Sequence, residues 1–167
     1  MRIEDFNGLP ADAAREVLRP AADVGWWVDG LVAARPYDDR DALLARAERD
    51  AARWSTADVD AALAHHPRIG ERPAGEGAEA AHSRREQAAI VDPGPRDPGL
   101  EEAVAAGNAA YEARFDRVFL IRAAGRTRKE ILDELVRRLD NEPAAEAAEV
   151  AEQLTQIALL RLDGILS

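Results

Sequence analysis

The sequence predicts an all-α protein, folded as a single-domain helical bundle of about seven to nine helices. The 167 residues fit one domain, 1–167, and are enough to bury a core. Apolar residues make up 47% of the chain, and many of them are alanine, which favours helices and disfavours strands. Valine, isoleucine and aromatic residues never alternate with polar residues over a long run, so no strand pattern competes.

Four helices are expected in the first 65 residues. They cover residues 11–19, 21–34, about 39–54 and 55–65. Pro20 and Pro36 end the first two, because the residue before a proline disfavours the helical conformation. Asp38 or Asp39 caps the third helix and Ser55 caps the fourth.

The second half of the chain contains two loops rich in glycine and proline, which flank a short helix. The loops cover residues 67–78 and 92–99, and the helix covers 83–90. Such loops often carry functional residues on a rigid scaffold, although they also serve as plain connectors.

Three further helices follow, over residues 100–115, 128–139 and 143–166. Thr127 and Glu130 form a capping box at the start of the second, and Pro143 starts the third. The short apolar stretch 118–123 fits a strand as well as a helix.

The charge and the cysteine count exclude several classes of protein. A net charge of -10 repels phosphate backbones, so we expect no nucleic-acid partner. The absence of cysteine excludes disulfides and thiolate chemistry. No apolar run approaches the roughly 20 residues of a membrane span, and the first ten residues lack an apolar signal core. We therefore expect a cytoplasmic protein with no membrane partner.

His66 is the first candidate for a chemical role. Pro67 forces the preceding helix to end here, so His66 lies at a helix C-terminus, where the helix dipole favours the protonated imidazole. Such a histidine can act as an acid or a base near neutral pH. From the residues alone, a surface histidine at a helix end is the simpler interpretation.

Ser83, Glu86 and Gln87 form a second candidate group. The Ser-x-x-Glu spacing is also that of a capping box, which only starts a helix. Glu86 beside Gln87 nevertheless offers a carboxylate and an amide together, which suits a polar heterocycle.

Arg161 interrupts an apolar helical stripe formed by Val150, Leu154, Ile157 and Ile165. A guanidinium in such a stripe needs a partner, because an unpaired buried charge is costly. A substrate carboxylate and an internal acid such as Glu86 both fit that role.

Other polar residues carry weaker signals. Asn108, Tyr111 and Phe115 share one helical face, which predicts core packing with a polar edge. His82 has no motif around it and is expected at the surface. His65 and His66 are adjacent rather than four residues apart, so a metal site is not predicted.

Taken together, these patterns resemble the OHCU (2-oxo-4-hydroxy-4-carboxy-5-ureidoimidazoline) decarboxylase family along nearly the whole chain. The matching motifs, in chain order, are Phe6-Asn7-Gly8-Leu9, Trp26 or Trp27, Ala34-Arg35-Pro36-Tyr37, His66-Pro67-Arg68-Ile69-Gly70, Ser83 to Gln87, Asn108-x-x-Tyr111-x-x-Arg114-Phe115 and Arg161-Leu162. Each motif alone is weak, but their order and spacing make the resemblance specific. One departure is Asp116, which stands where the family usually has glycine.

The resemblance implies a decarboxylase of urate breakdown that converts its substrate to S-(+)-allantoin and CO₂ as a homodimer. It implies that no cofactor is needed, because the C=N bond next to the carboxylate-bearing carbon accepts the electrons. It implies that His66 and Glu86 are catalytic. The substrate-binding residues that it implies are Pro67, Ser83, Gln87, Phe119, Leu120, Ile121, Arg122, Ala123 and Arg161.

Two other functions stay open at this point. One is a non-catalytic helical binding domain related to this family. The other is a different hydrolase or lyase acting on a related ureido compound. Activity measurements on a panel of substrates separate all three.

Overall fold

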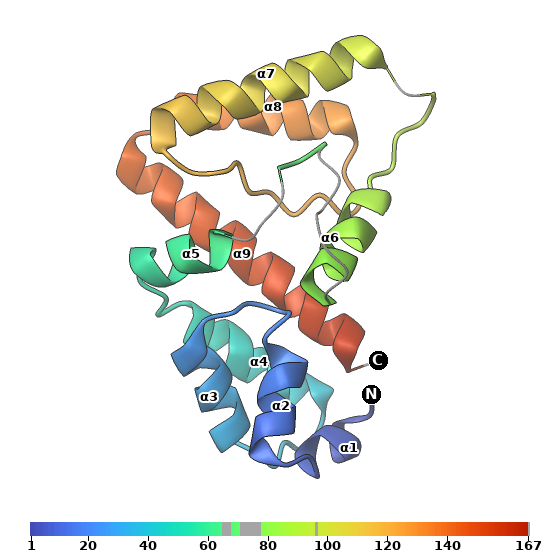
Figure 1. The fold of residues 1–167 in the computed structure, drawn as a ribbon, viewed down its shortest axis with the longest axis vertical. Helices are drawn as coiled ribbons and strands as arrows, with labels where there is room; N and C mark the ends of the chain where they lie inside the picture. The colour runs from blue at the N-terminus through green and yellow to red at the C-terminus, as the bar shows by residue number, and fades with distance from the viewer. Residues whose placement is uncertain (65–67, 71–77, 96, 167) are drawn as a thin grey trace. The chain divides into compact units, whose positions relative to one another are not determined.

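The computed structural model describes residues 1–64, 68–70, 78–95 and 97–166 (Figure 1). Within these residues the chain forms nine helices and no strand, so the prediction of an all-α protein is confirmed. The helices are α1 (Ile3–Asn7), α2 (Ala11–Leu18), α3 (Gly25–Ala33), α4 (Arg40–Ala51), α5 (Thr56–Leu63), α6 (Ala78–Ala88), α7 (Pro98–Phe115), α8 (Arg128–Leu139) and α9 (Pro143–Ile165). No helix among the described residues has the length and apolarity to cross a membrane.

The contacts divide the chain into two compact units. The terminal unit comprises residues 1–62 and those from 154 onward, and the central unit comprises residues 63–153. Helix α9 contributes its first half to the central unit and its second half to the terminal unit.

The terminal unit is built around fully buried apolar side chains. Its largest ones are Phe6, Leu18, Trp27, Leu31, Leu43, Leu154 and Leu162. The indole N–H of Trp27 donates a hydrogen bond to the carbonyl of Ala47 at 3.0 Å, so the polar atom of this buried ring is satisfied. This bond ties α3 to α4.

Two early motifs of the sequence contact each other in the terminal unit. The side-chain amide of Asn7 both donates to the Tyr37 carbonyl at 2.8 Å and accepts from the Tyr37 N–H at 3.0 Å. The Arg35 guanidinium donates to the carbonyls of Phe6 and Leu9, at 2.9 and 2.8 Å. These bonds satisfy carbonyls at and beyond the end of α1, so the motif that contains Arg35 and Tyr37 stabilises the conformation of the motif at residues 6–9.

The predicted helix starts in this unit are partly confirmed. Asp39 caps α4 by accepting from the Ala42 N–H at 2.7 Å, and the Ser55 hydroxyl accepts from the Asp58 N–H at 3.2 Å at the start of α5. The helix expected over 21–34 begins only at Gly25, because the chain first turns after Pro20. Helix α1 has no side-chain cap at its start, and the helical pattern did not predict it.

In the central unit, α7 and α8 lie side by side (Figure 1). A Cβ atom at Gly107 would lie 2.6 Å from Leu135, so glycine allows this close approach. The core between and beneath the two helices contains Tyr111, Phe119, Ile121, Ala123, Ile131 and Leu135. The predicted core role of the Asn108–Tyr111 face is therefore confirmed, since both side chains are buried.

The capping box at the start of α8 is confirmed in full. The Thr127 hydroxyl accepts from the Glu130 N–H, and the Glu130 carboxylate accepts from the Thr127 N–H. Residues 118–123, for which strand and helix were both open, form neither.

Candidate active site

The catalytic histidine expected from the sequence, His66, and its neighbour Pro67 lie outside the described residues. The chain is described up to Ala64 and resumes at Arg68. The other predicted site residues fall on α6, on the segment 119–123 and on α9.

Helix α6 carries Ser83, Glu86 and Gln87. Their spacing of three and four residues places them on one face of the helix. Ser83 is buried, whereas Glu86 and Gln87 are half-buried. The structure therefore brings a hydroxyl, a carboxylate and an amide together on one helical surface.

Several expectations about this helix are wrong. Helix α6 begins at Ala78 rather than at residue 83, because the alanine-rich stretch before Ser83 is itself strongly helix-forming. Ser83 thus lies inside the helix and does not start it, so the Ser-x-x-Glu spacing is not a capping box here. For the same reason Glu86 and Gln87 do not lie at the helix N-terminus. His82, expected at the surface, is half-buried.

The chain segment that follows Pro67 is fixed to α6 and α7 by three side chains. The Gln87 amide donates to the Arg68 carbonyl and accepts from the Gly70 N–H, both at 3.4 Å. Asn108 on α7 donates to the Ile69 carbonyl at 3.0 Å. These bonds anchor residues 68–70 in the central unit.

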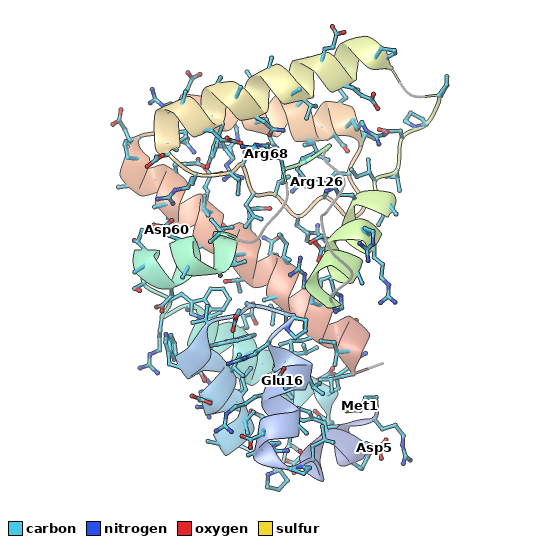
Figure 2. All side chains as sticks on the ribbon, in the orientation of Figure 1. Met1, Asp5, Glu16, Asp60, Arg68 and Arg126 are labelled. Atoms are coloured by element: carbon cyan, nitrogen blue, oxygen red, sulfur yellow. The ribbon has the colours of Figure 1, made fainter. Side chains whose placement is uncertain are left out.

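The Arg68 side chain also anchors this segment, because its guanidinium pairs with the carboxylate of Glu112 on α7. Figure 2 labels Arg68 beside that helix. Hydrogen bonds from the guanidinium favour the ionised carboxylate, so the pKa of Glu112 is lowered. The charge of Arg68 is thereby neutralised locally.

A cavity of about 600 Å³ lies in the central unit, between this segment, α6 and α7. Its lining residues are Arg68, Ile69, Gly70, Gln87, Ala88, Ile90, Glu101, Val104, Ala105, Asn108, Ala109, Glu112 and Arg128. Of the predicted site residues that the structure describes, Gln87 lines it, whereas Ser83, Glu86 and the segment 119–123 do not. Arg128 at its edge is paired with Asp92.

The segment 119–123 runs through the core of the central unit. Phe119, Leu120, Ile121 and Ala123 are each at most 6% exposed, and Arg122 is half-buried. The end of α6 is joined to the turn that follows this segment, because Gly125 N–H donates to the Ala89 carbonyl and Val91 N–H donates to the Arg126 carbonyl, both at 3.0 Å. The two predicted parts of the site, α6 and 119–123, are thus connected through hydrogen-bonded main chain.

A buried polar network lies against this segment. Arg138 on α8 and Glu146 on α9 form an ion pair in which each side chain is 1% exposed. Tyr111 also donates its hydroxyl to Glu146, and burial together with this carboxylate raises the pKa of Tyr111. The remaining guanidinium nitrogen of Arg138 donates to the Leu120 carbonyl at 2.8 Å.

Neither Arg138 nor Glu146 was predicted from the sequence as a functional residue. A signal was present, because Ile131, Leu135 and Arg138 follow one another at spacings of four and three on α8. An arginine in such a buried stripe needs a partner, as was argued for Arg161.

Arg161 is buried in the terminal unit, as its apolar stripe predicted, with 3% of its surface exposed. Its guanidinium donates to the Pro20 carbonyl at 3.1 Å. The partner identified within the terminal unit is therefore a main-chain oxygen.

Among the described residues, no group of three histidine, aspartate or glutamate side chains is arranged to hold a metal ion. His65 and His66 lie outside those residues.

Comparison with known families gives one match that covers most of the chain. The sequence model described as OHCU decarboxylase matches residues 7–163. A 2-oxo-4-hydroxy-4-carboxy-5-ureidoimidazoline decarboxylase from Amia calva is 36% identical over 105 residues. That alignment covers 60% of this chain and 57% of the relative, so it spans little more than half of the relative's length.

Two solved structures have a similar fold. A crystal structure of OHCU decarboxylase in the presence of (S)-allantoin has a TM-score of 0.73 at 20% identity, covering 90% of this chain and 97% of that one. A crystal structure of (S)-allantoin synthase has a TM-score of 0.73 at 16% identity, covering 100% of this chain and 54% of that one. At these identities the similarity concerns the fold.

Proposed function

The chain belongs to the OHCU decarboxylase family, and from this premise we propose that it converts 2-oxo-4-hydroxy-4-carboxy-5-ureidoimidazoline to S-(+)-allantoin and CO₂ in urate breakdown. The family match over residues 7–163 supports this activity most strongly, because that range includes every residue of the predicted site. The grouping of Ser83, Glu86 and Gln87 on one face of α6 agrees with it.

The chemistry makes modest demands on the protein. The carboxylate sits on a carbon that bears a hydroxyl group and adjoins a C=N bond. When CO₂ leaves, the bonding electrons form a C=C bond to the neighbouring carbon, and the C=N electrons move onto nitrogen, which takes a proton. The hydroxyl of the resulting enol then becomes the C=O of allantoin as a proton is delivered to one face of the ureido-bearing carbon. The residues have to orient the carboxylate, stabilise the developing charge and supply that proton.

We assign the catalytic roles to His66 and Glu86. His66 acts as acid and base on the C4 hydroxyl or the nearby ring nitrogen. Glu86 hydrogen-bonds the substrate and orients or shares a proton with His66. Pro67 forms the wall beside His66.

The binding roles go to α6, Arg161 and the segment 119–123. Ser83 and Gln87 bind polar groups of the ring or the ureido chain. The hydrogen bonds of Gln87 to Arg68 and Gly70 are long, at 3.4 Å, so its amide can exchange them for bonds to substrate atoms. Arg161 holds a carboxylate or carbonyl oxygen, and main-chain groups of 119–123 contact the ring.

We also propose that the protein is a cytoplasmic homodimer. The absence of cysteine agrees with a reducing compartment, and the homodimer rests on the family resemblance. Light scattering coupled to gel filtration measures the subunit number directly. A mass near twice 18.1 kDa that persists on dilution to working concentrations would support the homodimer, and a mass near 18.1 kDa would contradict it.

The activity is tested by the circular dichroism of allantoin formed from substrate generated in situ, with urate oxidase and hydroxyisourate hydrolase acting on urate. Uncatalysed decay gives racemic product, so a dichroic signal reports enzymatic turnover. We expect a rapid S-(+) signal from the wild-type protein, and its loss in His66→Asn and Glu86→Gln. His82→Asn, which changes a histidine outside the family motifs, is the matched control and keeps the signal.

If folded wild-type protein gave no circular dichroism signal from allantoin, the decarboxylase activity would be rejected. The alternative of a related, non-catalytic binding domain would then be favoured. Full activity in His66→Asn would reject the assigned mechanism while retaining the reaction. Turnover of a different ureido compound in a substrate panel would redirect the assignment to another lyase or hydrolase.

A further inference from the structure

We propose that Asn108 and Glu112 on α7 are positioning residues that hold the segment 68–70, and through it His66, in place for catalysis. The proposal rests on the proposed function and deepens it. Neither side chain has to touch the substrate, because each acts on the chain that leads back to His66.

Asn108 binds the main chain of the segment. Its Nδ2 atom donates to the Ile69 carbonyl at 3.0 Å, and the residue is 5% exposed. The Ile69 side chain packs against the apolar core that contains Tyr111 and Leu135. Ile69 is thus held in the central unit through both its carbonyl and its side chain.

Glu112 binds the residue that precedes Ile69. The guanidinium of Arg68 pairs with both carboxylate oxygens of Glu112. Asn108 and Glu112 are four residues apart, so they project from the same face of α7. One helical face therefore holds two consecutive residues of the segment.

Burial alone does not explain an amide at position 108. Within the described part of the chain, the Oδ1 atom of Asn108 is buried and has no hydrogen-bond partner. An amide that is buried with part of its hydrogen-bonding capacity unused costs free energy, so it stabilises a core poorly. The bond to the Ile69 carbonyl accounts for a polar side chain here.

The two tethers from α7 complement Gln87 on α6. Gln87 also binds the segment, but its bonds to Arg68 and Gly70 are long and can be exchanged for bonds to the substrate. Asn108 and Glu112 are not among the proposed substrate contacts. They can therefore keep the segment in place while Gln87 binds the substrate.

The covalent chain carries this anchoring to His66. Two residues of chain span at most about 7 Å, so fixing Arg68 limits where the imidazole of His66 can lie. Pro67 stands between them, and its ring fixes its φ angle, which removes one of the few rotations that could move His66 relative to Arg68. A catalytic group misplaced by about 1 Å can cost about 100-fold in rate, so the tethers should affect turnover.

The test replaces Asn108 with leucine, which has a similar size but cannot donate to the Ile69 carbonyl. We expect kcat for the in situ substrate to fall about 10- to 100-fold in Asn108→Leu, while KM stays near the wild-type value, because the substrate contacts remain and the acid–base group is misplaced. Glu112→Leu should lower kcat in the same direction but less, because the pair with Arg68 is partly exposed.

Asn7→Leu is the matched control. The side-chain amide of Asn7 also donates to a distant main-chain carbonyl, that of Tyr37, but it does so in the terminal unit. This control should lower the melting temperature and leave kcat unchanged at temperatures where the protein is folded. The same pattern in Asn108→Leu would show a purely structural role and overturn the proposal.

A second measurement does not depend on turnover. The chain has three histidines, so the imidazole NMR signal of His66 can be identified by its loss in His66→Asn. This signal should shift in Asn108→Leu and stay in place in Asn7→Leu, because the first variant releases the segment and the second does not.

The outcomes separate this proposal from the proposed function. An active wild-type protein together with wild-type kcat in Asn108→Leu would overturn the positioning role and leave the decarboxylase assignment intact. An inactive, folded wild-type protein would reject the decarboxylase. In that case an unchanged His66 signal in Asn108→Leu would overturn the positioning role as well.

Discussion

Arg138 and Glu146 form an ion pair across the core of the central unit, with each side chain 1% exposed. Asn141 donates to the second carboxylate oxygen of Glu146 at 2.8 Å, and Tyr111 donates to the first. Every strong donor and acceptor of the pair is thus engaged. Such a pair is costly to break, because removing one partner leaves the other charge buried and alone.

We therefore expect Arg138→Met to lower the free energy of unfolding by about 3–5 kcal/mol. Urea denaturation followed by far-ultraviolet circular dichroism measures this change. Arg137→Met is the matched control, because Arg137 also pairs with two acids, Glu134 and Glu149, but its side chain is 48% exposed. That exposed pairing should contribute no more than about 1 kcal/mol. If both variants lowered the free energy of unfolding by the same amount, burial of the Arg138–Glu146 pair would not explain its contribution to stability.

The local elements of the fold were predictable because their signals lie within a few residues of each other. Thr127 and Glu130 form the capping box that their spacing indicates, and Asp39 caps α4. Pro143 starts α9, because its missing N–H costs nothing at the first helical position. The start of α6 was not predictable in this way, since Ser83 imitates a cap within a sequence that is helical on both sides.

Only part of the candidate site was predictable from local patterns in the sequence. Ser83, Glu86 and Gln87 lie on one face of α6, because their spacing of three and four residues decides it. The hydrogen bond from Arg138 to the Leu120 carbonyl could not be predicted, because no local pattern selects one carbonyl 18 residues away. The pairing of Arg138 with Glu146 depends on how the chain turns between α8 and α9, through Asn141, and spacing alone does not determine that turn.

The contact of Gly107 with Leu135 gives a second prediction. A Cβ atom at Gly107 would lie 2.6 Å from Leu135 Cδ2, and Leu135 is fully buried. Gly107→Ala should therefore destabilise the protein by about 1–3 kcal/mol, because the leucine must leave its packed position. Gly30→Ala is the control, since nothing lies within 4 Å of its Cβ position in α3, and it should stabilise by about 0.5–1 kcal/mol. Thermal melts of both variants should shift in opposite directions; shifts of the same sign would contradict the close packing of α7 on α8.

Glu112 gives a prediction about acid stability. Its pKa is lowered from 4.5 by hydrogen bonds from Arg68, so its contribution to stability is present above pH 4.5 and is lost as the pH falls through the lower folded pKa. Since the Arg68 side chain is 44% exposed, the contribution should be no more than about 1 kcal/mol.

The measurement is the melting temperature of the wild type and of Glu112→Gln across this pH range. The wild type should melt about 2–4 °C higher above pH 5, and the two curves should converge toward pH 2. Addition of 1 M salt should narrow the gap, because the pair is partly open to solvent. A gap that is constant down to pH 2 would rule out a contribution from the charge of Glu112.

Asp116 gives the last prediction, at the position where the family usually has glycine. It follows the end of α7 with a φ angle of 54°, in the left-handed region, and its N–H donates to the Glu112 carbonyl at 2.9 Å. Aspartate tolerates this conformation better than most residues with a Cβ atom, so the chain turns toward 119–123 here without a glycine. Asp116→Gly should therefore stabilise the protein by about 1 kcal/mol, and Asp116→Val should destabilise it by at least as much, because a β-branched residue fits this region poorly. Urea denaturation measures both changes. The glycine variant should keep the wild-type KM, because glycine adopts the same left-handed conformation and leaves the path of the following segment unchanged. A changed KM would show that the Asp116 side chain does more than end α7.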